Sequence, residues 1–299
     1  MGRWDDIKFN RWEPLSPHTI PYRIYKSYDC DLMGMITSFE SAKGYIYHHL
    51  KEDGALWDSK AFDFGLMKKN KSRTIKEWSR NYEEFGNWVR LSLLVSLCSY
   101  LEIYMACIIK ESIESDPGIL IGTPHAIDGI ALKKRGSHIK KDEIDLRVKN
   151  CTKGTWQSRL EHMFQLYGKL PESLSNSISE LEAIRKIRND YGHAFGRDII
   201  ESHDYFKTNK SPIRRLSIKR FNKFRTLINR IVQDFDVFIN KKHIGNYEQI
   251  LQYHEIYNTI SLLNRGEQTI RLKASLHVAK NSVCNKDFCR GIIVYYNTL

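Results

Sequence analysis

An arginine and a histidine near the end of one amphipathic segment are the residues best suited to chemistry. Leucine, isoleucine and tyrosine side chains recur at helical spacing through residues 174–191 and form one continuous apolar arc on a helical wheel. Arg188 projects from the middle of that arc, where an unpaired charge would be costly to bury. An anion must therefore meet Arg188. It is either a buried carboxylate, with Glu102 as the obvious partner, or a phosphate that the planar guanidinium holds through two hydrogen bonds.

His193 follows Arg188 by five positions and comes directly after Gly192. Because glycine lets a helix loosen or end, the imidazole could turn onto the side of the helix that carries the arginine. Taken alone, a histidine at a helix end is more often a cap for exposed carbonyl groups than a catalyst. Its near-neutral reference pKa also suits a general acid or base, so both interpretations stay open.

The segment Arg188-Asn189-Asp190-Tyr191-Gly192-His193 resembles the R-x(4–6)-H signature of the HEPN superfamily, in which the residue after the arginine is characteristically polar. The context is similar as well. The segment ends an amphipathic helix, follows an apolar helix with a central glutamate, and precedes a strong amphipathic helix. The resemblance covers roughly residues 80–240. It implies a mainly α fold, a HEPN-like helical bundle with N-terminal and C-terminal extensions.

Many members of that superfamily are metal-independent endoribonucleases that act as dimers, with two motifs facing each other across one cleft. By this resemblance, Arg188 would hold the scissile phosphate and stabilise the charge of the transition state. His193 would act as general base on the ribose 2′-hydroxyl or as general acid on the leaving oxygen. Asn189 would orient the phosphate or the histidine, and Glu102 and Asp190 would have supporting roles. The implied products are a 2′,3′-cyclic phosphate and a 5′-hydroxyl.

The resemblance further implies a toxin or antiviral defence effector that cuts RNA, tRNA among the candidates, and that forms a homodimer restrained by an inhibitor or regulatory protein. No cofactor and no metal is expected. Some HEPN-like domains only bind nucleic acid or protein, so a non-catalytic binding module is the alternative. In that case Arg188 pairs with Glu102, and His193 is a helix cap.

Composition agrees with a polyanionic partner. The 299 residues include 47 lysines and arginines against 35 aspartates and glutamates, a formal charge of +12. Nucleic acid is the first candidate and an anionic membrane surface the second. A hydrophobic content of 41% excludes a wholly disordered chain. The usual nucleotide-binding, zinc-protease and serine-hydrolase motifs are missing from the sequence, and the adjacent His48 and His49 lack a nearby acidic or cysteine partner.

The six cysteines form no C-x-x-C pair, and the N-terminus has no apolar stretch of the signal-peptide kind, so a cytoplasmic location is expected. Residues 88–113 are nevertheless apolar enough for a membrane span. Glu102 near their centre argues against that interpretation, because a carboxylate is expensive in lipid. Three serines on the same segment also argue against a membrane span. We therefore expect a buried helix and no membrane partner.

Three segments are expected along the chain: an N-terminal arm of residues 1–75, a bundle of residues 76–242 with an insertion at 115–154, and a C-terminal extension of residues 243–299. The first forty residues are expected to be mostly irregular, and the insertion to be a solvated connection. A strand is expected at 291–296. Apolar periodicity predicts helices at 36–50, 88–113, 156–167 with Gly168 as the stop, 173 or 177 to 191, 216–239 and 247–263.

Overall fold

The computed structural model describes residues 4, 7–60, 74–194, 213–278 and 284–299, and the side chains of residues 193 and 194 are not among the described parts. The sequence also has a basic stretch at 68–73 and a segment expected to be a loop at 201–212, and both lie outside the described residues. The described chain is mainly α and contains no β-strand, apart from an isolated bridge between Lys60 and Thr74. The elements are α1 (Ile20–Glu52), α2 (Ile75–Ser115), η2 (Pro117–Ile121), α3 (Gly129–Lys134), α4 (Lys141–Thr152), α5 (Trp156–Tyr167), α6 (Glu172–Ser175), α7 (Ile178–Ala194), α9 (Ile218–Ile239), η3 (Asn240–Ile244), α10 (Tyr247–Ile260), α11 (Arg265–Val278) and α12 (Lys286–Thr298).

Several predicted helices are confirmed. The helix expected at 156–167 is α5, and Gly168 ends it in the left-handed conformation at φ +67°. The helix expected at 216–239 is α9, and the one expected at 247–263 is α10. The predicted apolar face of α9 is buried, with Phe221 and Phe235 both fully inaccessible. Apolar periodicity therefore located these helices well, because each has one buried face.

Three predictions are wrong. The strand expected at 291–296 belongs to α12, where Ile292 and Tyr296 lie on one buried face at helical spacing. The irregular arm extends only to Thr19, because α1 begins at Ile20 and continues through the helix predicted at 36–50. The connection expected at 115–154 is largely helical and contains η2, α3 and α4.

The chain forms two compact units, whose boundaries fall inside α1, α2 and α9 and at the start of α7. The terminal unit comprises residues 1–25, 102–178 and 229–299, and the hairpin unit comprises residues 26–101 and 179–228.

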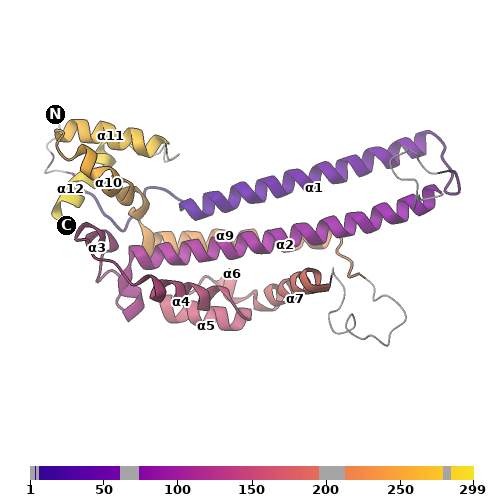
Figure 1. Ribbon diagram of the computed structural model, residues 1–299, viewed down its shortest axis with the longest axis horizontal. Coiled ribbons are helices and arrows are strands. Elements are labelled where there is room, and N and C mark those ends of the chain that lie inside the picture. The colour runs from indigo at the N-terminus through magenta and orange to yellow at the C-terminus, as the bar shows by residue number, and fades with distance from the viewer. Residues whose placement is uncertain (1–3, 5–6, 61–73, 195–212, 279–283) are drawn as a thin grey trace. The chain divides into compact units, whose positions relative to one another are not determined.

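In the hairpin unit, α1 and α2 run side by side in opposite directions (Figure 1). Ring contacts follow the pair: Tyr28 stacks on Tyr100, and farther along Phe39 stacks on Tyr82. Residue numbers rise along one helix as they fall along the other, which is the register of an antiparallel pair. A charged contact adds α9, since Arg225 donates two hydrogen bonds of 2.6 Å to the buried carboxylate of Asp29. The leucines of α2 at 91, 94 and 97 are fully buried.

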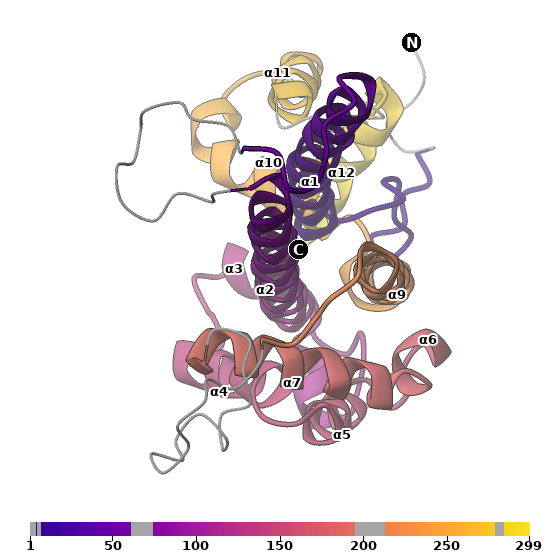
Figure 2. The ribbon, with the colours of Figure 1, turned by 90° about the vertical axis from the view of Figure 1, so that its right-hand side faces the viewer.

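In the terminal unit, α4 packs on α5, and α10, α11 and α12 pack together (Figure 2). The first turn of α1 also belongs to this unit. The hydroxyl of Thr19 accepts a hydrogen bond from the Tyr22 amide, and the carboxylate of Glu248 accepts one from the Ile20 amide. Thr19 in turn donates to Asp236 at 2.5 Å. Glu248 and Thr19 therefore satisfy two of the amide groups in the first turn of α1 that have no partner within the helix.

Among the described helices, α2 alone is long and apolar enough to cross a membrane by length and composition, with a mean hydropathy of 1.8 over its best window. Half of that window is buried inside the protein. The core helix of a protein without a membrane meets the same test, so the finding is weak evidence for a membrane span.

Candidate functional site

The predicted chemical residues lie at the end of α7, in the hairpin unit. The apolar face expected for this helix is confirmed, because Leu181, Ile184 and Ile187 are at most 3% exposed. Arg188, which the helical wheel places in the middle of that face, is half-buried. Its Nη1 donates a hydrogen bond to Asn189 Oδ1 at 3.1 Å, so the two residues that follow one another in the motif are also in contact. Asn189 thereby orients one edge of the guanidinium.

Asp190 and Tyr191 attach this end of α7 to its surroundings. Asp190 is only 5% exposed, and its Oδ2 lies 3.0 Å from Nη2 of Arg214. The hydroxyl of Tyr191 shares a hydrogen bond of 2.6 Å with the hydroxyl of Ser92 on α2. Asp190 therefore has a structural partner, and its supporting role in the motif stays a prediction. Charged and polar contacts on two sides limit the movement of the motif.

Two residues of α2 that sequence reasoning missed hold the chain that leads into α9. Asn87 donates to the carbonyl of Arg214 at 3.0 Å and accepts from the amide of Leu216 at 2.8 Å. Arg90 donates to the carbonyl of Leu216 at 2.7 Å and forms an ion pair with Glu40 at 3.1 Å. A polar residue within an otherwise apolar helix is the signal that could have revealed them, since buried polar groups need partners.

The position of His193 differs from expectation in one respect. Helix α7 continues past Gly192 to Ala194, so the prediction that this glycine loosens or ends the helix is wrong. Five positions on a continuous α-helix are separated by about 140° around the axis. The His193 side chain lies outside the described parts, and its role stays a prediction.

Glu102, the predicted partner of Arg188, belongs to the terminal unit, whereas Arg188 belongs to the hairpin unit. The ion pairs of Glu102 include Arg159 of α5 at 3.6 Å and Lys153 at 3.3 Å. Arg159 is 6% exposed, so this carboxylate balances a nearly buried cation. Its supporting role toward the motif stays a prediction.

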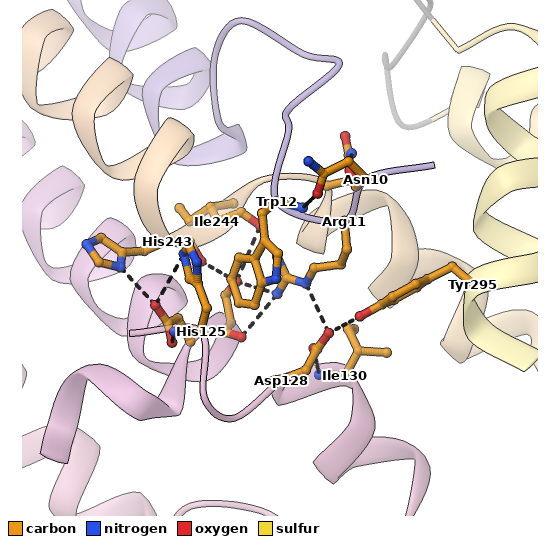
Figure 3. Close-up of polar contacts among 12 residues, drawn as sticks. Asn10, Arg11, Trp12, His125, Asp128, Ile130, His243, Ile244 and Tyr295 are labelled. Carbon is orange, nitrogen blue, oxygen red and sulfur yellow. Dashed lines mark hydrogen bonds and ion pairs between the residues drawn. The ribbon is translucent and has the colours of Figure 1, made fainter. Parts of the chain in front are cut away.

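A second polar cluster, centred on Arg11, lies in the terminal unit and was not foreseen from the sequence. Arg11 is 2% exposed, and burial lowers the pKa of its guanidinium, against the attraction of Asp128. Its Nη2 donates to Ser115 Oγ at 2.7 Å, and its Nε lies 3.3 Å from Asp128 Oδ2. Figure 3 shows the side chains of Arg11, Asp128 and Tyr295 pointing toward one another. This arginine fixes the N-terminal arm against the loop before α3.

Histidines occur in two groups that could bind a metal ion. His48 and His49 do have an acidic partner, contrary to expectation, because Glu52 lies 3.1 Å and 3.4 Å from them on the exposed face of α1. In the described part of the chain, the group with ligand atoms close enough to share one ion is Asp116, His125 and His243.

Comparison with known proteins does not assign the chain: no family model matches it, and neither a curated protein nor a solved structure is significantly similar.

Proposed function

We propose that this protein is a cytoplasmic endoribonuclease of the HEPN type that cleaves RNA by attack of a ribose 2′-hydroxyl on the adjacent phosphate. The observation that carries the proposal is the Arg188–Asn189 contact at the end of a helix whose apolar face is buried. A guanidinium carries its N–H donors in a planar fork that matches the oxygens of a phosphate.

In the proposed reaction, Arg188 binds the two non-bridging oxygens of the scissile phosphate and stabilises the extra charge of the transition state. His193 takes the proton of the 2′-hydroxyl, or gives a proton to the departing 5′-oxygen. The new bond joins the 2′-oxygen to phosphorus, and the bond from phosphorus to the 5′-oxygen breaks. The products are a 2′,3′-cyclic phosphate and a 5′-hydroxyl, and the step requires no metal.

The contacts around the motif support this role because a catalytic arginine needs a fixed position. Asp190 and Tyr191, the next two residues of the motif, are held by Arg214 and Ser92. Arg188 and Asn189 therefore lie directly before two residues that are held at the end of the helix. Preorganisation of this kind reduces the reorganisation needed in the transition state.

The net charge of +12 supports an RNA substrate, since cations that neutralise phosphates provide affinity independent of sequence. We further propose that two copies pair so that their motifs form one cleft, and that an inhibitor or regulatory protein restrains a toxin or antiviral defence effector of this kind. The same proposal includes a HEPN-like arrangement of the helical bundle, and it includes tRNA as a candidate substrate.

The test is incubation of the purified protein with total RNA and tRNA, with and without excess EDTA, followed by mapping of the cut ends. We expect wild-type cleavage to survive EDTA, and Arg188→Ala and His193→Ala each to abolish it. Arg185→Ala is the matched control: it removes an arginine one turn earlier on α7 that is paired with Glu182. This control should cut RNA like the wild type.

Unchanged cutting by Arg188→Ala would remove the proposed mechanism. Tight RNA binding by the wild type without any cleavage would instead identify the protein as a binding module. In that case Arg188→Ala would lower the affinity for RNA or the stability of the protein.

A further inference from the structure

Three potential metal ligands converge in the terminal unit, and none of them takes part in the proposed cleavage reaction. Asp116 precedes η2, His125 lies in the loop before α3, and His243 lies in η3. Asp116 and His243 are 0% and 5% exposed, whereas the side chain of His125 is 41% exposed. The cluster is thus buried on one side and open to solvent on the other.

The carboxylate of Asp116 is oriented between the two imidazoles. Its Oδ1 accepts the backbone amide of His125 at 2.8 Å, which leaves Oδ2 facing both rings. Oδ2 lies 2.9 Å from Nδ1 of His243 and 3.9 Å from Nε2 of His125. One ligand atom from each residue lies within 4.8 Å of the others.

These distances are close to those that a tetrahedral zinc shell requires. With bonds of about 2.0–2.1 Å, neighbouring ligand atoms in such a shell are about 3.4 Å apart. One distance from Oδ2 must therefore lengthen, and the other must shorten, by about half an ångström. Side-chain rotations of that size need no change of the helices.

The backbone around the cluster is unusual in ways that favour a binding site. His125 has φ +65°, the left-handed conformation that residues other than glycine seldom adopt, and it is alone in this among the described non-glycine residues. His243 lies in a π-helical turn, Asn240–Ile244, a feature found often at functional sites. The backbone at both histidines therefore adopts a conformation that is unfavourable in free energy.

Neighbouring side chains hold the exposed histidine in place. Trp12 stacks on the His125 ring with centroids 3.9 Å apart, and Arg11 lies 3.9 Å above the Trp12 ring. The buried Arg11 network described above anchors that stack (Figure 3). Support of a ligand by residues that do not touch the metal is typical of protein metal sites.

We propose that Asp116, His125 and His243 bind one Zn²⁺ ion, with water completing the coordination shell from the solvent side. One carboxylate and two imidazoles are a common donor set for zinc. On binding, the metal takes the place of the proton that His243 Nδ1 donates to Asp116. That proton moves to Nε2 when Nε2 is bare, or to solvent when Nε2 already carries a proton, so that the ligand is a neutral imidazole. The hydrogen bond that His125 Nε2 donates to the carbonyl of Lys242, now 2.6 Å, breaks in the same step if Nε2 is the ligand, and its proton moves to Nδ1. The ion fastens the loop before α3 to η3.

The test is zinc binding to the full chain after removal of metal by a chelator, measured by competition with a chromogenic indicator and by metal analysis. We expect one equivalent of zinc per chain. His125→Asn and Asp116→Asn should each weaken binding by at least about tenfold, since changes even to residues behind the ligands cost that much. Asparagine tolerates positive φ, so His125→Asn keeps the backbone. His277→Asn, at an exposed histidine on α11, is the matched control and should bind zinc normally.

A second readout is the visible absorption of Co²⁺ bound in place of zinc, which should show a tetrahedral spectrum in wild type and lose it in His125→Asn. Absence of stoichiometric zinc, or equal affinity in His125→Asn and His277→Asn, would overturn the proposal. The result is independent of the ribonuclease proposal, because cleavage that depends on Arg188 is measured with EDTA present, at a temperature where the metal-free protein stays folded.

Discussion

Substituting Glu248 with glutamine should change how the stability of the protein depends on pH. Glu248 is 8% exposed, accepts the amide of Ile20, and shares a hydrogen bond with Glu111. Burial raises the pKa of Glu248 from 4.5 to about 7, and burial together with the neighbouring Glu248 raises the pKa of Glu111. Between about pH 4.5 and pH 7, Glu248 therefore keeps a proton in the folded state that it has released in the unfolded state.

The sign and the size follow from that difference. A pKa that is higher in the folded state contributes stability that is fully present below about pH 4.5 and is lost as the pH rises through about 7. At about 1.4 kcal/mol for each pKa unit, the free energy of unfolding should fall by about 3 kcal/mol across this range because of Glu248. The limiting slope is about −1.4 kcal/mol per pH unit. Glu248→Gln cannot ionise and should remove this part of the pH dependence.

The assay is urea unfolding, followed by circular dichroism, at pH values from 4.5 to 8. As the pH rises, the difference in the free energy of unfolding between wild type and Glu248→Gln should shift by about 3 kcal/mol in favour of the variant. Glu255→Gln is the matched control, because Glu255 is an exposed glutamate on the same helix, α10. Curves for Glu248→Gln and wild type that stay parallel over the whole range would refute the reasoning.

Two further substitutions test the packing of each unit. Gly245→Ala should lower the free energy of unfolding by about 2–3 kcal/mol, measured by thermal or urea denaturation. The reason is that Gly245 has φ +57° and that a Cβ there would lie 2.4 Å from the carbonyl oxygen of Arg11. An alanine variant as stable as wild type would contradict that geometry. Arg214→Ala should lower the free energy of unfolding by about 2 kcal/mol, since it leaves the carboxylate of Asp190 buried without its cation. Adding Asp190→Asn to this variant should recover part of the loss. If Arg214→Ala alone is as stable as wild type, the ion pair contributes nothing.

The fold could be predicted from the sequence where one helix face is buried and the other is solvated. Helix α9 shows this, because its phenylalanines and isoleucines recur at a strict helical period. The first half of α1 escaped prediction because Pro21 stands in its first turn, where proline is tolerated, and because aromatic residues on both sides weaken the period. The segment 291–296 is a run of apolar and aromatic residues too short to separate a strand from a helix by pattern alone.

The candidate site was predictable only where its residues are adjacent in sequence. Arg188 and Asn189 form a local motif, and their side chains are in contact in the structure. The partners of this motif are distant: Asp190 meets Arg214, and Tyr191 meets Ser92. Pairings of that kind depend on how helices pack, which a single sequence does not show. The Asp116–His125–His243 cluster likewise joins positions more than a hundred residues apart.

The most direct test of the central claim is the cleavage of RNA by wild type, Arg188→Ala and Arg185→Ala in excess EDTA, with the ends of the fragments identified chemically. The account predicts fragments with 2′,3′-cyclic phosphates and 5′-hydroxyls from wild type and Arg185→Ala, and intact RNA with Arg188→Ala. Equal cleavage by all three proteins, or intact RNA with all three, would contradict it.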